Sequence, residues 1–237
     1  MRPPTPEPAA GGMAPGTVVL LSGPTCSGKT TLARALQAVL PRPYLHVGLD
    51  HFEAMQPSVD GRRVNLFYGQ QRHPREDPDS WGADLVGVMH GCVRSFARAG
   101  TGVIVEHIFL KRRWLKDVVE QLAGLPVLFV GVTCPVEVLE ERERARQCTV
   151  ARPGQAARQH RMLAALDAES PYDVTVDTHA STIDDAALAI LRRLDAGPPF
   201  AFHSLRGSPI LDAPDGEAAT PAACTPPADG AAASTAG

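Results

Sequence analysis

Two kinds of hydrophobic run alternate along this chain. Short continuous apolar runs are typical of strands buried on both faces, and longer stretches with apolar residues three or four apart are typical of helices. Strands are predicted at 17–21, 44–49, 103–105, 127–132 and 173–176. Helices are predicted at 31–40, 81–98, 114–122, 135–146, 155–166 and 183–194. This alternation predicts an α/β fold with a mostly parallel sheet covered by helices on both faces.

The two ends of the chain lack this periodicity. Residues 1–15 are dominated by Pro, Ala and Gly, and residues 198–237 by Ala, Pro, Gly, Thr and Asp. Such segments bury too little apolar surface to order themselves. We therefore expect a disordered N-terminal extension, one domain at 16–197 and a disordered tail. Met13, just before the first predicted strand, is a candidate start residue.

Composition and charge exclude several classes of partner. A net charge of −3 gives no general attraction to nucleic acid or to anionic membranes. No apolar run approaches the roughly 18 residues that a membrane span needs, and the N-terminus lacks the apolar stretch of a signal peptide. Five cysteines without C-x-x-C spacing indicate neither a disulfide framework nor a zinc site. We expect a cytosolic protein.

The stretch GPTCSGKT, from Gly23 to Thr30, fits G-x-x-x-x-G-K-[ST] directly after the first predicted strand. In such a loop, glycines let backbone N–H groups wrap a phosphate chain, and the lysine reaches the β- and γ-phosphates. The threonine hydroxyl ligates Mg²⁺, and the helix behind the loop points its positive end at the anion. The predicted nucleotide-binding residues are Gly23, Pro24, Thr25, Cys26, Ser27, Gly28, Lys29, Thr30 and Thr31.

A glycine-rich turn that matches by accident is the alternative. Composition argues against it, because only three of the 23 Lys and Arg residues are lysines. A chain that uses arginine nearly everywhere has lysine at this position. The sequence therefore favours a P-loop NTPase-type fold with three layers, ATP and Mg²⁺ as cofactors, and Lys29 in a catalytic role.

Two acidic residues follow predicted strands, at the sheet edge where ligands bind in open parallel sheets. Asp50 is the candidate base for an acceptor hydroxyl, although it could instead cap the short helix that follows it. Glu106 is the candidate holder of the Mg²⁺ water shell, with a weaker claim to the role of base. No N-K-x-D guanine motif and no ATP-binding-cassette signature is present, which leaves a small kinase.

Four arginines flank the segment between the helices predicted at 135–146 and 155–166: Arg142, Arg144, Arg146 and Arg152. Arginines in this position are compatible with a helical lid that closes on ATP and brings guanidinium groups to the transferring phosphate. Alternatively, they lie on a solvated helix, with pairs such as Glu140 and Arg144. We expect Arg146 and Arg152, nearest the break, to contact phosphate, and Arg142 and Arg144 to lie on the surface.

Isolated histidines and cysteines give little evidence for a metal site or a catalytic role. We expect His46, His90 and His160 to be structural, because none has a second ligand at metal spacing. Cys26 lies inside the loop and could be modified there, but nothing in the sequence assigns it to catalysis.

Six segments together resemble the chloramphenicol phosphotransferase-like family over nearly all of 16–194. They are LSGPTCSGKTT, PRPYLHVGLDHFEAM, VIVEHIFL, VLFVGVTCP, RERAR and PYDVTVDT. The resemblance implies transfer of the γ-phosphate of ATP to a hydroxyl of chloramphenicol, an antibiotic-resistance activity, with Asp50 as base. Three departures fall near the acceptor: Glu106-His107 replaces a pair of acids, His51 replaces a small polar residue, and the segment 61–79 has little match to the family.

The sequence thus favours an ATP-dependent O-phosphotransferase that acts on a small-molecule hydroxyl. One alternative is a kinase of another metabolite, such as a sugar or nucleotide-sugar. A second alternative, from another class, is a nucleotide-binding module with little turnover. The oligomeric state and the identity of the acceptor are left open by the sequence.

Overall fold

The computed structural model describes residues 14–55, 58–59, 62–63, 85–146, 154–169, 171–198 and 200–212. The main strands are β1 (Val18–Ser22), β2 (Tyr44–Gly48), β5 (Gly102–His107), β6 (Val127–Thr133) and β7 (Val174–Asp177). The α-helices are α1 (Lys29–Val39), α2 (Leu49–Ala54), α3 (Leu85–Arg98), α4 (Arg112–Gln121), α5 (Val136–Ala145), α6 (Gln155–Glu169) and α7 (Ile183–Asp195). A small antiparallel pair, β3 (Ser58–Val59) and β4 (Arg62–Arg63), follows α2.

The main sheet is parallel, with strand order β2-β5-β1-β6-β7. β1 lies at its centre, where Val18 pairs with Val103 on one side and Val127 on the other. All five residues of β1 are buried, as expected for a strand that is covered on both faces. The carboxyl ends of β1, β5 and β2 therefore reach the same edge of the sheet.

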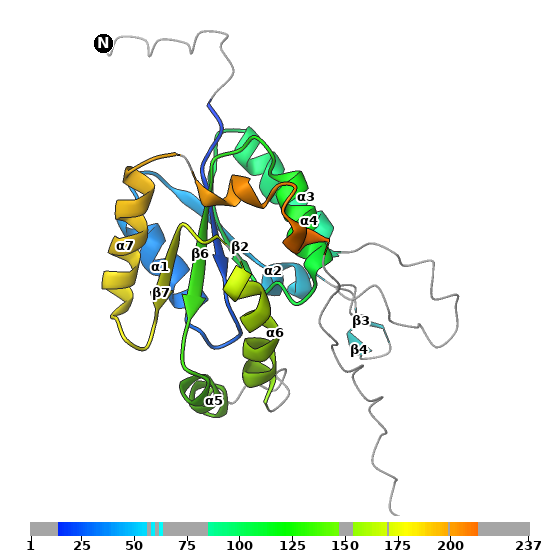
Figure 1. The fold of residues 1–237 in the computed structure, drawn as a ribbon, viewed down its shortest axis with the longest axis vertical. Coiled ribbons are helices and arrows are strands. Elements are labelled where there is room, and N and C mark those ends of the chain that lie inside the picture. Colours follow the sequence, from blue (N-terminus) through cyan, green and yellow to red (C-terminus); the bar gives the residue numbers. More distant parts are fainter. Residues whose placement is uncertain are drawn as a thin grey trace, which may run out of the picture.

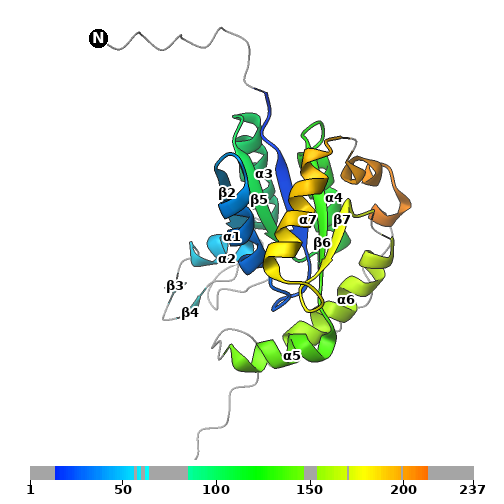
Figure 2. The ribbon, with the colours of Figure 1, turned by 90° about the vertical axis from the view of Figure 1, so that its left-hand side faces the viewer.

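Helices cover both faces of the sheet (Figure 1). α3 and α4 pack on one face, where Met89, Leu115 and Val118 join the core, while α1 and α7 pack on the other through Leu32 and Ile190. α5 and α6 extend beyond the carboxyl end of β6, as the turned view shows (Figure 2). These three layers confirm the predicted α/β fold. None of the helices in the described ranges is long and apolar enough to cross a membrane.

The end of the domain differs from the prediction. Two 3-10 helices, η2 (Ala201–Leu205) and η3 (Pro209–Leu211), follow α7 and pack on the face of α4 and β6. Phe202 and Leu205 are among the fully buried side chains of the core. The boundary at 197 is therefore too early, because the domain includes 200–212. Of the expected extension at 1–15, residues 1–13 lie outside the described residues, and so do residues 213–237 of the expected tail.

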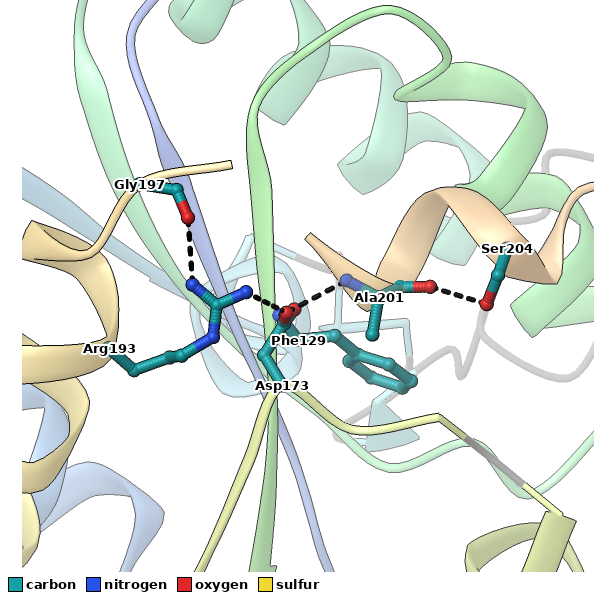
Figure 3. Close-up of polar contacts among 6 residues, drawn as sticks. All are labelled: Phe129, Asp173, Arg193, Gly197, Ala201 and Ser204. Atoms are coloured by element: carbon teal, nitrogen blue, oxygen red, sulfur yellow. Dashed lines mark hydrogen bonds and ion pairs between the residues drawn. The ribbon is translucent and has the colours of Figure 1, made fainter. Parts of the chain in front are cut away.

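A buried carboxylate fixes this C-terminal segment to the sheet (Figure 3). The side chain of Asp173 is 1% exposed, and its Oδ1 accepts hydrogen bonds from Arg193 Nη2 and from the backbone N–H of Ala201, both at 2.8 Å. Its Oδ2 accepts the N–H of Phe129 at 2.9 Å. Arg193 also donates to the carbonyl of Gly197 at 2.9 Å. A buried charge needs such partners, and here they join β6, α7 and η2.

Candidate active site

The GPTCSGKT stretch forms the loop between β1 and α1, where the motif predicted it. A Cβ atom on Gly23 would lie 2.4 Å from the carbonyl oxygen of Val132, so only glycine fits beside β6. Gly28 has φ 90° and precedes the first residue of α1. Cys26 also has a left-handed φ, 62°, which is unfavourable for a residue with a side chain. Tight glycine contacts and a strained residue at a helix start are features of an anion-binding loop.

Lys29 begins α1 and is folded against the loop. Its Nζ donates to the carbonyl oxygens of Gly23 at 2.9 Å and Pro24 at 2.6 Å, and the residue is 7% exposed. Burial lowers the pKa of Lys29 to about 8, although the negative charges of Glu106 and Asp50 act in the opposite direction. Lys29 therefore still carries a positive charge at neutral pH, inside the loop where a phosphate would bind.

Thr30 and Glu106 meet at the end of β5. Thr30 Oγ1 donates to Glu106 Oε2 at 3.0 Å, and His46 Nε2 pairs with Glu106 Oε1. Burial raises the pKa of Glu106, but the hydrogen bond from His46 and the charge of Lys29 outweigh it, and the net pKa lies below the usual value. The carboxylate is therefore ionised at neutral pH.

This pair of oxygen donors fits Mg²⁺. Hydroxyl and carboxylate oxygens are the hard donors that Mg²⁺ prefers, and Mg²⁺ keeps several waters and phosphate oxygens as its other ligands. Within the part of the chain that the structure describes, no three His, Cys, Asp or Glu side chains form a metal cage. Thr30 and Glu106 suit a metal that is held mainly by water and phosphate.

Asp50 lies in the first turn of α2, one residue beyond its start, and is exposed. In the sheet, β5 separates β2, the strand that leads to Asp50, from β1, the strand that leads to the phosphate loop. Asp50 is nevertheless close enough for its charge to raise the pKa of Lys29. Its position in the first turn of a helix is also one that a carboxylate stabilises, so the alternative role in the helix stays open.

Arg142 corrects the expectation for the lid arginines. It is partly buried, and its Nη1 donates to the carbonyl of Cys26 at 3.3 Å. Nη1 and Nη2 also bind Thr178, whose hydroxyl donates to the carbonyl of Ser27 at 2.8 Å. Leu139, three residues earlier on α5, is fully buried, so helical spacing turns Arg142 inward. Arg142 therefore anchors the phosphate loop and is not a surface residue.

The other lid arginines have different environments. Arg144 is exposed and donates to the carbonyl of Glu140, one helical turn earlier, at 3.3 Å, as expected for a surface residue. Arg146 caps the end of α5 and is exposed, and its charge helps to lower the pKa of Lys29. Arg152 lies outside the described residues. Thr31 stands exposed on the first turn of α1.

Gln159 was not identified from the sequence, and His46 was expected only to be structural. The Oε1 atom of Gln159, on α6, accepts the backbone N–H of Thr25 at 2.7 Å. Helical spacing could have placed Gln159 on the inward face of α6, because it shares that face with the buried Ala156 and Leu163, but the sequence does not show which group it meets. His46 pairs with Glu106 only because β2 lies beside β5, and the sequence does not give that register.

His107, at one of the departures from the family pattern, is a core residue. It is fully buried, and it stacks on Phe109 with ring centroids 3.9 Å apart. His90 Nε2 lies 3.1 Å from His107 Nε2, and His90 Nδ1 pairs with Asp117. Burial and the neighbouring His90 lower the pKa of His107 well below its usual value. The histidine is therefore neutral and joins β5 to α3 and α4.

Comparison with known proteins places this site in a family. The family described as chloramphenicol phosphotransferase-like protein matches residues 16–195. A protein of Mycobacterium tuberculosis H37Rv, provisionally named an O-phosphotransferase, is 30% identical over 210 residues, which cover 84% of this chain and 91% of the relative.

Solved structures agree on the fold. A sugar kinase from Janibacter is 25% identical with a TM-score of 0.53, covering 77% of this chain and 98% of its own. The APS kinase of Mycobacterium tuberculosis, solved with AMPPNP and APS, is 18% identical with a TM-score of 0.50, covering 76% and 98% of the two chains. At that identity the likeness shows the fold alone. The chain belongs to the chloramphenicol phosphotransferase-like family and is a phosphotransferase with the P-loop kinase fold.

Proposed function

We propose that the protein transfers the γ-phosphate of ATP to a hydroxyl group of a small molecule. The observation that carries the proposal is the convergence of three charged groups at one sheet edge. Lys29 lies inside the loop, Glu106 is bonded to Thr30, and Asp50 lies within electrostatic reach of Lys29. Phosphoryl transfer needs little more than positioning and charge stabilisation, and these residues can supply both.

In this proposal the loop and Lys29 bind the phosphate chain of ATP, because backbone N–H groups and an ammonium compensate its negative charge. Thr30 and Glu106 would hold Mg²⁺, the glutamate through water, and the ion would neutralise the negative charge that develops on the phosphates. Arg146 approaches the same region from the lid, and Arg152 is its proposed partner.

Asp50 is the proposed base. Its carboxylate would orient the acceptor hydroxyl and accept its proton as the bond to phosphorus forms, while the leaving oxygen stays on ADP. Asp50 is exposed among the described residues, so a small molecule can reach its carboxylate.

The acceptor class has two candidates. Chloramphenicol is the acceptor that the family description suggests. A sugar is suggested by the likeness to a sugar kinase. The buried, neutral His107 stands where the family pattern has an acid, and the exposed His51 stands beside Asp50 where the family pattern has a small polar residue. Both differences fall near the proposed acceptor, so they support an acceptor other than chloramphenicol without selecting a sugar.

The test is a panel assay with the purified chain, ATP and Mg²⁺. Chloramphenicol, gluconate, other sugars and nucleotide-sugars are offered in parallel, with ADP formation and the mass of the product as readouts. Lys29→Ala is the matched control for contaminating kinases. A phosphorylated product above that control supports the proposal and names the acceptor. Nucleotide binding with no product from any acceptor would favour the binding module instead.

A further inference from the structure

The amide of Gln159 reaches the phosphate loop from a distant part of the chain. Gln159 is 5% exposed on α6, and its Oε1 accepts the Thr25 N–H at 2.7 Å, across 134 residues of sequence. Thr25 lies in the loop, four residues before Lys29. We propose that Gln159 is a positioning residue for the nucleotide phosphates, which fixes the Thr25 peptide from outside the loop. The inference rests on the proposed nucleotide-binding role of the loop.

The contact completes a set of side chains that hold successive loop residues. Gln159 holds the N–H of Thr25, Arg142 the carbonyl of Cys26, and Thr178 the carbonyl of Ser27. A peptide that rotates exchanges the directions of its N–H and C=O groups, so each of these bonds favours one loop shape. Because Cys26 is in a strained conformation, the loop shape depends on such outside bonds.

Hydrogen bonds join the N-terminal end of α6, close to Gln159, to α5. Glu143, next to Arg142, accepts the backbone N–H groups of Gly154 at 2.8 Å and Ala156 at 3.0 Å. Ala156 packs with Leu139 and Cys134 in a small apolar cluster, against which Cys26 of the loop also packs. The position of Gln159 is therefore fixed relative to α5 and to the loop.

The distinction between a positioning role and a merely structural one can be measured. A buried N–H that loses its acceptor exchanges its hydrogen faster and frees the peptide to rotate. If that peptide sets the phosphate site, the affinity for nucleotide falls. If the contact only stabilises the domain, the melting temperature falls and the affinity of the folded protein does not change.

The experiment uses the full chain with three variants. Gln159→Met has a similar length but removes the acceptor oxygen, Gln159→Glu keeps an acceptor, and Arg161→Ala changes an exposed residue on the same helix. The readouts are the hydrogen-exchange rate of the Thr25 amide, the Kd for ATP and for ADP with Mg²⁺ by calorimetry, and the thermal melt.

We expect Thr25 to exchange at least tenfold faster in Gln159→Met and to stay protected in Gln159→Glu. The Kd for both nucleotides should rise about tenfold in Gln159→Met, the factor that one ordinary hydrogen bond is worth. KM for ATP should rise with it, while KM for the acceptor stays unchanged. Arg161→Ala should match the wild type in every readout.

Several results would overturn the inference. An unchanged Kd in a folded Gln159→Met, with or without faster exchange of Thr25, would show that the contact does not position the nucleotide site. An equal loss of affinity in Arg161→Ala would show that the effect is not specific to the amide. Failure of the wild type to bind either nucleotide would overturn the proposed function and this inference together.

Discussion

Arg142 and Thr178 are joined by two hydrogen bonds, from Nη1 to the threonine hydroxyl and from Nη2 to its carbonyl, each 3.0 Å long. The two residues come from α5 and from the turn after β7. Together they stand behind the loop, because Arg142 bonds to Cys26 and Thr178 bonds to Ser27. The planar guanidinium fork makes this arrangement possible, and a lysine cannot reproduce it.

Arg142→Lys should therefore weaken nucleotide binding. Two or more hydrogen bonds are lost while the charge stays, so we expect the Kd for ATP to rise about tenfold to a hundredfold. Calorimetric titration with Mg·ATP is the measurement. Arg144→Lys, at an exposed position on the same helix, is the matched control and should bind like the wild type. Equal Kd values for the two variants would contradict the anchoring role.

The buried Lys29 predicts a pH dependence of nucleotide affinity. Its pKa is about 8 in the free protein, and a bound phosphate chain raises it by favouring the charged form. Binding is then independent of this group below pH 8, where Lys29 is already protonated. Above pH 8 binding must take up a proton, so the affinity should fall by up to tenfold per pH unit.

The measurement is the Kd for ADP between pH 7 and pH 10. Lys29→Met should bind weakly and lose the dependence above pH 8. Because the Cys26 thiol lies in the same loop, Cys26→Ser is the second control and should keep the wild-type profile. A flat wild-type profile would show that the charge of Lys29 does not contribute to binding.

Glu106→Gln tests the proposed metal site. The amide retains an oxygen for the Thr30 hydroxyl but loses the charge that favours Mg²⁺. We expect the gain in ADP affinity on adding Mg²⁺ to shrink at least tenfold, while binding without Mg²⁺ stays near wild type. If kcat falls and the effect of Mg²⁺ on binding is intact, Glu106 acts as the base.

The C-terminal segment should be required for stability. Residues 200–211 supply five buried apolar side chains, each worth about 1.5–3 kcal/mol when fully buried. A chain that ends at Gly197 loses all five and leaves Asp173 without the N–H of Ala201. We expect it not to fold stably, whereas a chain that ends at Asp212 keeps every one of these contacts.

A point substitution gives the same test with less disruption. Phe202 is 1% exposed and packs edge-on against Phe129. Phe202→Ala should lower the free energy of unfolding by about 3–5 kcal/mol, as measured by urea denaturation. Ser204→Ala, in the same 3-10 helix but exposed, should lower it far less. A similar stability for both variants would contradict the packing role of the segment.

The main strands and helices were predictable because the spacing of apolar residues indicates which positions of an element are buried. β1 is apolar throughout and buried throughout, and α1 carries apolar residues at helical spacing. The C-terminal segment was missed because Phe200, Phe202, Leu205 and Ile210 are spaced for neither a helix nor a strand. They lie among Pro, Gly and Ser residues that give the region the composition of a tail.

The candidate site also has one part that the sequence predicts and one part that it does not. The loop and Lys29 were predictable because the residues that bind phosphate are contiguous in the chain. The partners of the loop were not, because Gln159 meets Thr25 across 134 residues and Arg142 meets Thr178 across 36. Charge pattern alone could not say which arginine of α5 faces inward. Helical spacing from Leu139 selects Arg142 once that leucine is known to be buried.

The role of Asp50 is the prediction on which the chemistry depends. Asp50→Asn keeps the size of the side chain and most of its hydrogen bonds but cannot accept a proton. If Asp50 is the base, kcat for acceptor phosphorylation should fall about 10²–10⁴-fold, with little change in the affinity for ATP. The transition state of phosphoryl transfer is loose and the proton can leave late, which places the loss toward the lower end of that range.

The alternative role makes a different prediction for the same variant. If Asp50 only stabilises the start of α2, asparagine serves almost as well, and both kcat and the melting temperature should stay near the wild type. Asp50→Ala separates stability from chemistry, because it removes both the proton acceptor and any interaction with the helix. A kcat for Asp50→Asn within about threefold of wild type would exclude a general base at this position, and Glu106 would then be the acid to test.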